Sequence, residues 1–202
     1  MPHRRSAREG PGRGRGVSDG RRVFLAWTAT FLAFPPSGFV ARELLGPVDA
    51  LGPALGGGLL VGLGVGAAQW LVLRRRLPGA ALWIPATAVG LAVGLAAGSS
   101  LVRYGTDLAD LALQGALSGL GVGALQALVL RRGGVRRGAL VWMLASAPQW
   151  ALGWTVTTLA GIDVERQYMN FGASGALAYS LCSGVLLARL LGARGAATCE
   201  GA

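Results

Sequence analysis

Six long apolar segments constrain this chain more than any other feature of its sequence. Short polar stretches separate them, and they fall at residues 23–40, 51–73, 80–102, 108–130, 139–161 and 171–191. A helix rises about 1.5 Å per residue and the hydrocarbon core of a bilayer is about 30 Å thick, so about 20 residues cross it. A soluble domain needs amphipathic or alternating patterns instead. The segments therefore predict an all-α bundle of six transmembrane helices.

The first segment is the weakest span, because Pro35 and Pro36 interrupt its helical hydrogen bonds. Proline is tolerated in lipid where neighbouring groups satisfy the freed carbonyls, so we expect a kinked span. Residues 1–22 are rich in Arg, Gly and Pro and have little apolar surface to offset the cost of ordering. We predict a disordered tail there, and a short second tail at residues 192–202.

The arginines predict the orientation of the bundle. All 19 basic residues are Arg. With the N-terminus in the cytoplasm, sixteen of them lie in the tails and inner loops, and only Arg42, Arg103 and Arg166 lie outside. Positive charge concentrates on the cytoplasmic side of membrane proteins. Both termini are therefore expected in the cytoplasm, in a bacterial plasma membrane.

An internal repeat lies within the bundle. The segment GLGVGAAQWLVLRR at residues 62–75 matches GLGVGALQALVLRR at residues 119–132 at twelve of fourteen positions, with an offset of 57 residues. Residues 183–191, SGVLLARLL, align as a weaker third copy that places Leu187 opposite Gln126. We expect three parallel two-helix repeats, the third degenerate, around a pseudo-threefold axis along the membrane normal.

Glycines recur at every fourth position in three of the segments. This spacing clears one helix face of side chains, so that a neighbouring backbone can approach closely and helices can pack in lipid. A dinucleotide loop has a similar pattern, but it needs a strand before the glycines, which an apolar span does not offer. The predicted helix-packing residues are Gly58, Gly62, Gly66, Gly90, Gly94, Gly98, Gly115, Gly119 and Gly123.

Three glutamines are the candidate polar residues of the spans. Gln69 and Gln126 occupy matching repeat positions, five residues before the next arginine, and Gln149 lies deeper in its segment. A buried amide needs hydrogen-bond partners. The glutamines are expected either to join helices by hydrogen bonds or to line a pathway for a polar solute.

The aromatic residues near the segment ends suggest interfacial anchors. Trp27, Trp70, Trp83 and Trp142 fall near the inner interface in this topology. Trp154, Tyr104, Tyr168 and Phe171 fall near the outer one. Amphipathic rings gather at the depth of the lipid headgroups. An aromatic belt is therefore expected here and not a stacking site.

Missing residue types exclude several kinds of chemistry. The sole histidine, His3, lies in the tail, which argues against a histidine-ligated metal or a histidine-activated nucleophile. The spans have no acid, lysine or histidine near their middle, which disfavours proton-coupled transport. Outer acids, at Asp107, Asp110, Asp163 and Glu165, form either a solvated face or a site for a hard cation.

The repeated GaaQWlvLRR segment and the adjoining Trp-to-Gly helices resemble a group of uncharacterised bacterial polytopic membrane proteins, a resemblance that implies no activity. No catalytic residue, metal or cofactor is predicted. The expected partners are the bilayer, anionic lipid headgroups at the cytoplasmic face, and a membrane-protein partner or a second copy, whereas nucleic acid is not expected. The sequence favours an accessory or helix-packing subunit, with a small-solute channel or transporter as the alternative.

Overall fold

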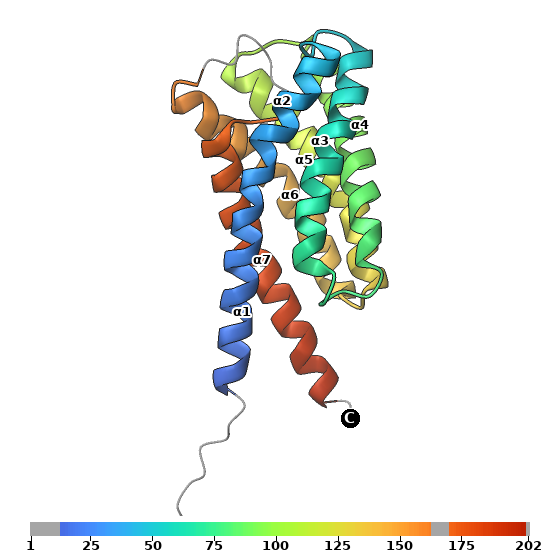
Figure 1. Ribbon diagram of the computed structural model, residues 1–202, viewed down its shortest axis with the longest axis vertical. Coiled ribbons are helices and arrows are strands. Elements are labelled where there is room, and N and C mark those ends of the chain that lie inside the picture. Colours follow the sequence, from blue (N-terminus) through green and yellow to red (C-terminus); the bar gives the residue numbers. More distant parts are fainter. Residues whose placement is uncertain (1–12, 163–169, 201–202) are drawn as a thin grey trace, which may run out of the picture.

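The computed structural model describes residues 13–162 and 170–200, and within these ranges every regular element is helical. The prediction of an all-α bundle is confirmed (Figure 1). Asp163, Glu165, Arg166 and Tyr168 lie outside the described residues. The elements are α1 Arg13–Thr28, η1 Ala29–Ala33, α2 Phe34–Leu45, α3 Leu51–Leu73, η2 Ala80–Leu82, α4 Trp83–Leu101, α5 Leu108–Arg132, α6 Arg136–Leu159 and α7 Ala173–Glu200.

Five helical stretches are long and apolar enough to cross a membrane: Asp19–Leu45, Leu51–Leu73, Ala80–Leu101, Leu108–Arg132 and Ala173–Arg194. The sixth predicted span corresponds to α6, which is long enough but does not reach the same mean hydropathy. Its buried positions include indoles, a serine and a threonine, which hydropathy scales rate as polar. The three tryptophans, Ser146 and Thr157 of α6 therefore face the protein, and a mean hydropathy over the segment does not distinguish them from residues that face outward.

The first span bends where the sequence places its two prolines. The tighter 3₁₀ segment η1 precedes Pro35 and Pro36, which take the first turn of α2, where missing backbone N–H groups cost least. Residues 13–22, where disorder was expected, are helical and belong to α1. At the other end, α7 continues to Glu200, through most of the short tail expected at residues 192–202. A segment that extends an existing helix does not bear the cost of helix nucleation. The composition of the tails alone does not show that they continue from a helix.

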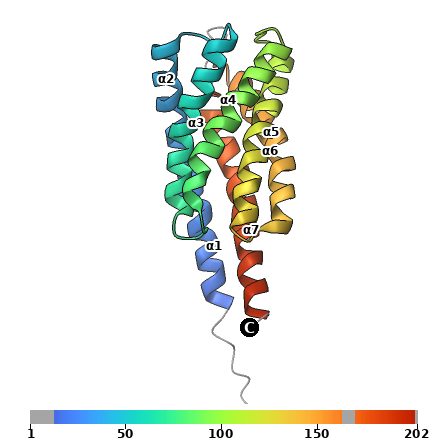
Figure 2. The ribbon, with the colours of Figure 1, turned by 90° about the vertical axis from the view of Figure 1, so that its right-hand side faces the viewer.

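The spans form a closed ring. Each packs against the next along the chain, and α7 returns to pack against α1, as Figures 1 and 2 show. The described parts of α1 and α7 extend past the other helices at the same end of the bundle (Figure 1). The chain therefore enters and leaves the bundle on one side.

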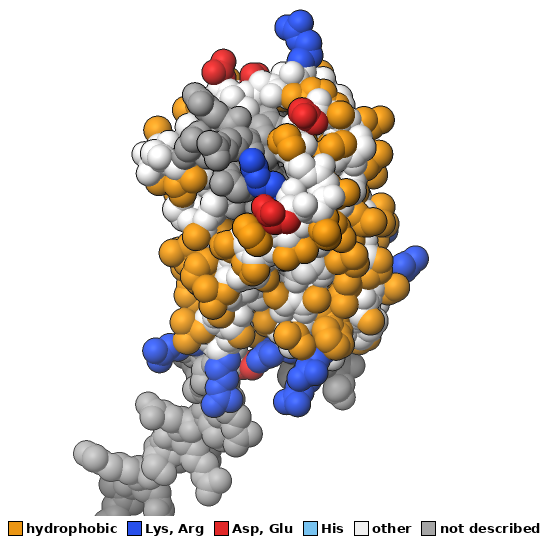
Figure 3. Space-filling model, turned by 45° about the horizontal axis from the view of Figure 1, so that its top comes forward, with side chains coloured by type: hydrophobic (Ala, Val, Ile, Leu, Met, Phe, Trp, Pro, Cys, Tyr) orange, Lys and Arg blue, Asp and Glu red, His pale blue; other side chains and the backbone are white. Residues whose placement is uncertain are grey.

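The two ends of the bundle carry opposite charge. Figure 3 shows a wide band of hydrophobic side chains between an end where arginines gather and an end where most acids lie. The acidic end carries Glu43, Asp49, Asp107 and Asp110, together with two arginines, Arg42 and Arg103. The arginine end carries Arg74, Arg75, Arg76, Arg131, Arg132, Arg136 and Arg137.

The interior consists of two separate hydrophobic clusters stacked along the bundle. The inner cluster, toward the arginine end, contains Trp27, Trp83 and Trp142. The outer cluster, toward the acidic end, contains Trp150, with Trp154, Phe34, Phe171 and Tyr179 among its other members. Both clusters are rich in aromatic side chains, but their polar neighbours differ.

Candidate functional site: a buried polar cluster around three tryptophans

Three indole rings meet at the centre of the inner cluster. Trp27 comes from α1, Trp83 from α4 and Trp142 from α6, which are alternate spans of the ring, and none of the three is more than 1% exposed. Their ring centroids lie 5.9, 5.8 and 5.8 Å apart in edge-to-face pairs. Such pairs add about 0.5–1.5 kcal/mol each beyond the area that they bury. The three rings therefore fill the middle of the bundle at this depth.

Two of the indoles donate to the repeat glutamines. The Trp83 Nε1–H group donates to Gln69 Oε1 over 2.8 Å, and the Trp142 Nε1–H group donates to Gln126 Oε1 over 2.9 Å. The amide of Gln126 then donates to Thr87 Oγ1 over 2.9 Å and to Gln69 Oε1 over 3.3 Å. Thr87 in turn donates to the Trp83 carbonyl. The structure thus joins the two glutamines in one hydrogen-bonded network.

The third indole has an equivalent acceptor on α7. Trp27 donates through Nε1 to Ser183 Oγ over 2.9 Å, and Ser183 donates to the Tyr179 carbonyl over 2.7 Å. Ser183 follows Gln126 by 57 residues, the same spacing that separates Gln126 from Gln69. The alignment that placed Leu187 opposite Gln126 is wrong for this role, since Leu187 is fully buried and apolar.

Gln149 does not join this network. It is half-buried on α6, and its side chain makes no hydrogen bond to any residue that the structure describes. The structure therefore brings together two of the three glutamines that the sequence singled out. It adds Thr87 and Ser183, small hydroxyl residues that sequence reasoning passed over.

The predicted aromatic belt is wrong for most of its members. Trp27, Trp83 and Trp142 lie inside the bundle, and Trp154 and Phe171 are also at most 2% exposed. An indole is amphipathic, so it suits a headgroup region and equally suits a buried site with an acceptor for its N–H group. Among the described members, Trp70 and Tyr104 are the exceptions, because both are partly exposed. The Arg74 guanidinium lies 5.7 Å from the centre of the Trp70 ring.

The nine glycines of the spaced sets lie where neighbouring helices approach closely. A Cβ atom on Gly58 would lie 2.7 Å from the Ala92 Cα, and one on Gly94 would lie 2.7 Å from the Ser118 Cα. The set on α3 faces α4, the set on α4 faces α5, and the set on α5 faces α6. Their contribution to stability stays a prediction. The glycines of these contacts are Gly58, Gly62, Gly66, Gly90, Gly94, Gly98, Gly115, Gly119 and Gly123.

The outer half contains buried polar atoms without partners. Gln114 on α5 is 1% exposed, and neither end of its amide has a hydrogen-bond partner among the described residues. The Trp150 Nε1–H group and the Ser118 hydroxyl are in the same condition. The sequence analysis missed Gln114. Its position one residue before a spaced glycine, Gly115, is a signal that could have placed it on the buried face.

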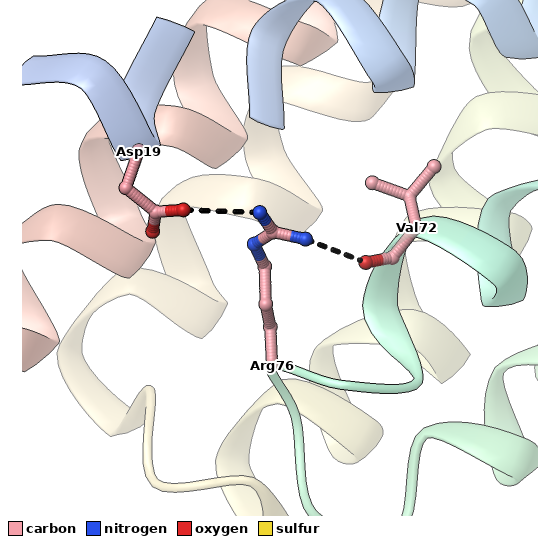
Figure 4. Close-up of polar contacts among 3 residues, drawn as sticks. All are labelled: Asp19, Val72 and Arg76. Carbon is pink, nitrogen blue, oxygen red and sulfur yellow. Dashed lines mark hydrogen bonds and ion pairs between the residues drawn. The ribbon is translucent and has the colours of Figure 1, made fainter. Parts of the chain in front are cut away.

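One ion pair connects α1 to the loop after α3 at the arginine end. Asp19 Oδ1 lies 3.0 Å from Arg76 Nη2, and Arg76 Nη1 donates to the Val72 carbonyl over 3.3 Å (Figure 4). The Asp19 side chain is 66% exposed, and such pairs contribute about 0–1 kcal/mol. Within the described residues no three metal-ligating side chains gather, and Asp163 and Glu165 of the suggested cation site lie outside them.

The inner network can donate and accept hydrogen bonds, but none of its residues ionises near neutral pH. Its geometry suits the joining of helices. No family model matches the chain, and no curated protein and no solved structure matches it either.

Proposed function

We propose that the chain is a multi-pass membrane protein without catalytic activity, which serves as a packing or accessory subunit of a bacterial plasma membrane. One observation carries this proposal: the centre of the bundle is occupied by three indoles whose N–H groups all have acceptors. A pathway for a polar solute needs polar groups left open to it. Here the three indole N–H groups, the amide of Gln126 and the hydroxyls of Thr87 and Ser183 all donate to partners within the bundle.

The proposed topology has six spans, with the arginine end in the cytoplasm. Support comes from the charge asymmetry and from α6, which packs along α5 and buries its three tryptophans, Ser146 and Thr157. We also infer three two-helix units. Their support is the equal spacing of Gln69, Gln126 and Ser183 and their common role as indole acceptors.

Cysteine accessibility tests this topology. Single cysteines are introduced into a chain in which Cys182 and Cys199 are replaced by Ser. Positions 75 and 132 should react with an impermeant maleimide only after the cells are permeabilised, whereas positions 49, 107 and 162 should react in intact cells. Position 162 follows α6, so its failure to react from outside would mean that α6 does not cross.

Flux measurements test the functional proposal. Purified protein in liposomes should pass ions and small neutral solutes no faster than protein-free liposomes, because the indoles close the centre. A reproducible flux that rises with protein density would contradict the proposal. A second copy of the chain and a different membrane protein are both candidate partners of the subunit. The oligomeric state of the purified protein in mild detergent shows whether it pairs with itself.

A small-solute channel or transporter is the second candidate, and the outer half favours it. The amide of Gln114, the Trp150 indole N–H and the Ser118 hydroxyl are buried without partners and could bind a polar solute. If the chain is a channel or transporter, liposomes that contain the wild-type protein show solute flux, and liposomes that contain the Gln114→Leu variant do not. If the chain is an accessory subunit, the wild-type protein and the variant both give no more flux than protein-free liposomes.

A further inference from the structure

Two adjoining hollows lie at the arginine end of the bundle. The arginine pocket, of about 480 Å³, lies between the start of α6 and the end of α7. A narrower groove of about 240 Å³ runs between α5 and α6. Arg136 lines both, so they meet at this residue. The pocket is lined by Gly134, Val135, Arg136, Arg137, Gly138, Leu190, Ala193 and Arg194.

The pocket is strongly basic. Arg136 and Arg137 are exposed, and neither has a carboxylate partner among the described residues. Arg194 is held over the pocket because its Nη1 donates to the Arg76 carbonyl over 3.0 Å. In residues 19–162 and 170–194, the acid at this end of the bundle is Asp19, which pairs with Arg76. Among residues 19–162 and 170–194, no further carboxylate at this end competes with a bound anion for Arg136 and Arg137.

The backbone at the pocket also favours an anion. The first turn of α6 begins at Arg136, and Val135 before it offers no side-chain cap for the free N–H groups. The helix dipole makes this end positive, so arginines here destabilise the helix rather than support it. Gly134, with φ +91°, bends the chain so that its Cα faces the Arg194 guanidinium. An anionic group would relieve both the uncapped turn and the crowded positive charge.

The groove beside the pocket is apolar and opens to the band that faces lipid. Ala124, Ala127 and Ala139 leave a hollow between α5 and α6, and the exposed Leu128 and Leu140 flank it. Arg131 and Arg136 stand at its basic end. From Arg131 to Ala124 the groove follows about two turns of α5, or roughly 10 Å of rise. Its shape and polarity fit one hydrocarbon chain.

We propose that the pocket and groove together bind one anionic glycerophospholipid, with its phosphate on Arg136, Arg137 and Arg194 and an acyl chain between α5 and α6. The inference deepens the proposed membrane role and rests on it, because a lipid of this kind meets the site only if the arginine end lies at a leaflet surface. Basic pockets between transmembrane helices at the cytoplasmic face are typical sites for acidic lipids.

The test measures lipid binding by native mass spectrometry of the full-length protein released from nanodiscs. One set of nanodiscs contains phosphatidylcholine with a fraction of phosphatidylglycerol. The control set has the same total lipid, all of it phosphatidylcholine. The wild type should retain one phosphatidylglycerol and no phosphatidylcholine. Inorganic phosphate and glycerol phosphate serve as separate competitors. They should displace the lipid poorly, because they lack the chain that fills the groove.

A matched pair of variants separates this site from general surface charge. The Arg136→Gln, Arg137→Gln double variant should bind phosphatidylglycerol roughly 25-fold more weakly, since each basic residue at an anionic surface contributes roughly fivefold. The control is the Arg74→Gln, Arg75→Gln double variant, which removes the same charge from exposed neighbours at the same end. It should bind as the wild type does. Equal loss in both double variants would overturn the proposal.

A third variant tests the groove without altering charge. Ala124→Phe fills the space for the acyl chain and should weaken phosphatidylglycerol binding, so that glycerol phosphate, whose contacts with the arginines are unaltered, displaces the lipid more readily than it does from the wild type. Unchanged lipid binding in this variant, or equal retention of phosphatidylcholine by the wild type, would also overturn the site. If cysteine labelling contradicts the proposed topology while the wild type still retains phosphatidylglycerol, the result counts against the proposed function and not against the lipid site.

Discussion

The inner and outer halves of the bundle solve the same packing problem in different ways. In the inner half, three indoles donate to Gln69, Gln126 and Ser183, so their N–H groups are satisfied. In the outer half, aromatic rings pack as closely, with Phe34 and Phe171 stacked at 5.3 Å, yet Gln114 and the Trp150 N–H group have no partner. The inner half combines close packing with a network of side-chain hydrogen bonds. The outer half has a buried hydrogen bond from Asn170 Nδ2 to the Phe34 carbonyl over 2.8 Å, but it leaves several other polar atoms unpaired.

This difference indicates which half fixes the arrangement of the helices. A buried donor with a single matching acceptor tolerates only one rotation of each helix, because any other rotation leaves the group unsatisfied in lipid. Aromatic packing alone accepts several similar arrangements. The inner half should therefore be the more rigid and the more sensitive to a lost polar atom, whereas close glycine contacts support both halves.

The glycine contacts are the first test, because substitution there should have the largest effect. A Leu at position 62 would collide with the Ala88 backbone of α4, and overpacking typically costs about 1–3 kcal/mol or more. We expect Gly62→Leu to lower the unfolding temperature in detergent markedly. Gly52→Leu on the same helix is the control, because nothing lies near that position. Equal tolerance at both sites would mean that the set on α3 does not hold helices together.

Two tryptophans of one helix provide a sharper comparison. Trp142 and Trp150 both lie on α6, and both are at most 2% exposed. Trp142 donates to the Gln126 amide oxygen over 2.9 Å, whereas the Trp150 N–H group lies beside the Tyr179 hydroxyl without a hydrogen bond of good geometry. Replacing either by Phe removes similar volume, and Trp142→Phe also leaves a Gln126 oxygen without its donor. An orphaned buried group costs about 1–3 kcal/mol.

We therefore expect Trp142→Phe to be the less stable variant by roughly 1–2 kcal/mol in urea or thermal unfolding in detergent. Trp142→His, if folded, serves as a partial rescue, because an imidazole retains an N–H donor. The comparison between the halves fails if Trp150→Phe is as destabilising as Trp142→Phe.

The fold followed from the sequence because segment length and charge placement are properties of the chain alone. The meeting of Gln69 and Gln126 was predictable from their equal depth in the repeat. The burial of Trp83 was not, since a residue near a span end can face lipid or protein, and only the closed ring of helices decides which. For the counterpart of Gln126 in the third repeat, the local similarity of apolar residues favoured Leu187. The constant spacing of 57 residues points instead to Ser183.

The polar atoms of the outer half lay beyond sequence reasoning for a different reason. Gln114 has no counterpart at the matching position 57 residues earlier, where Gly57 stands, so the repeat did not draw attention to it. Gln149 was selected for its depth in the segment, but depth does not fix the face of the helix. In the structure Gln149 is only half-buried, so part of its side chain is exposed on the outside of the bundle.

The glutamines provide the last and smallest effect, and the most direct test of the comparison. The Gln69→Leu, Gln126→Leu double variant removes both amides from the inner network and leaves two indole N–H groups without acceptors. Hydrogen bonds between transmembrane helices contribute only about 1 kcal/mol, so a loss on the order of 1 kcal/mol is expected. Gln114→Leu, by contrast, replaces an amide that has no partner, and should be neutral or slightly stabilising. Both variants are compared with the wild type by thermal unfolding in the same detergent. If Gln114→Leu proves the more destabilising, the outer amide has a partner such as a bound water or solute, and the two halves are alike in their polar chemistry.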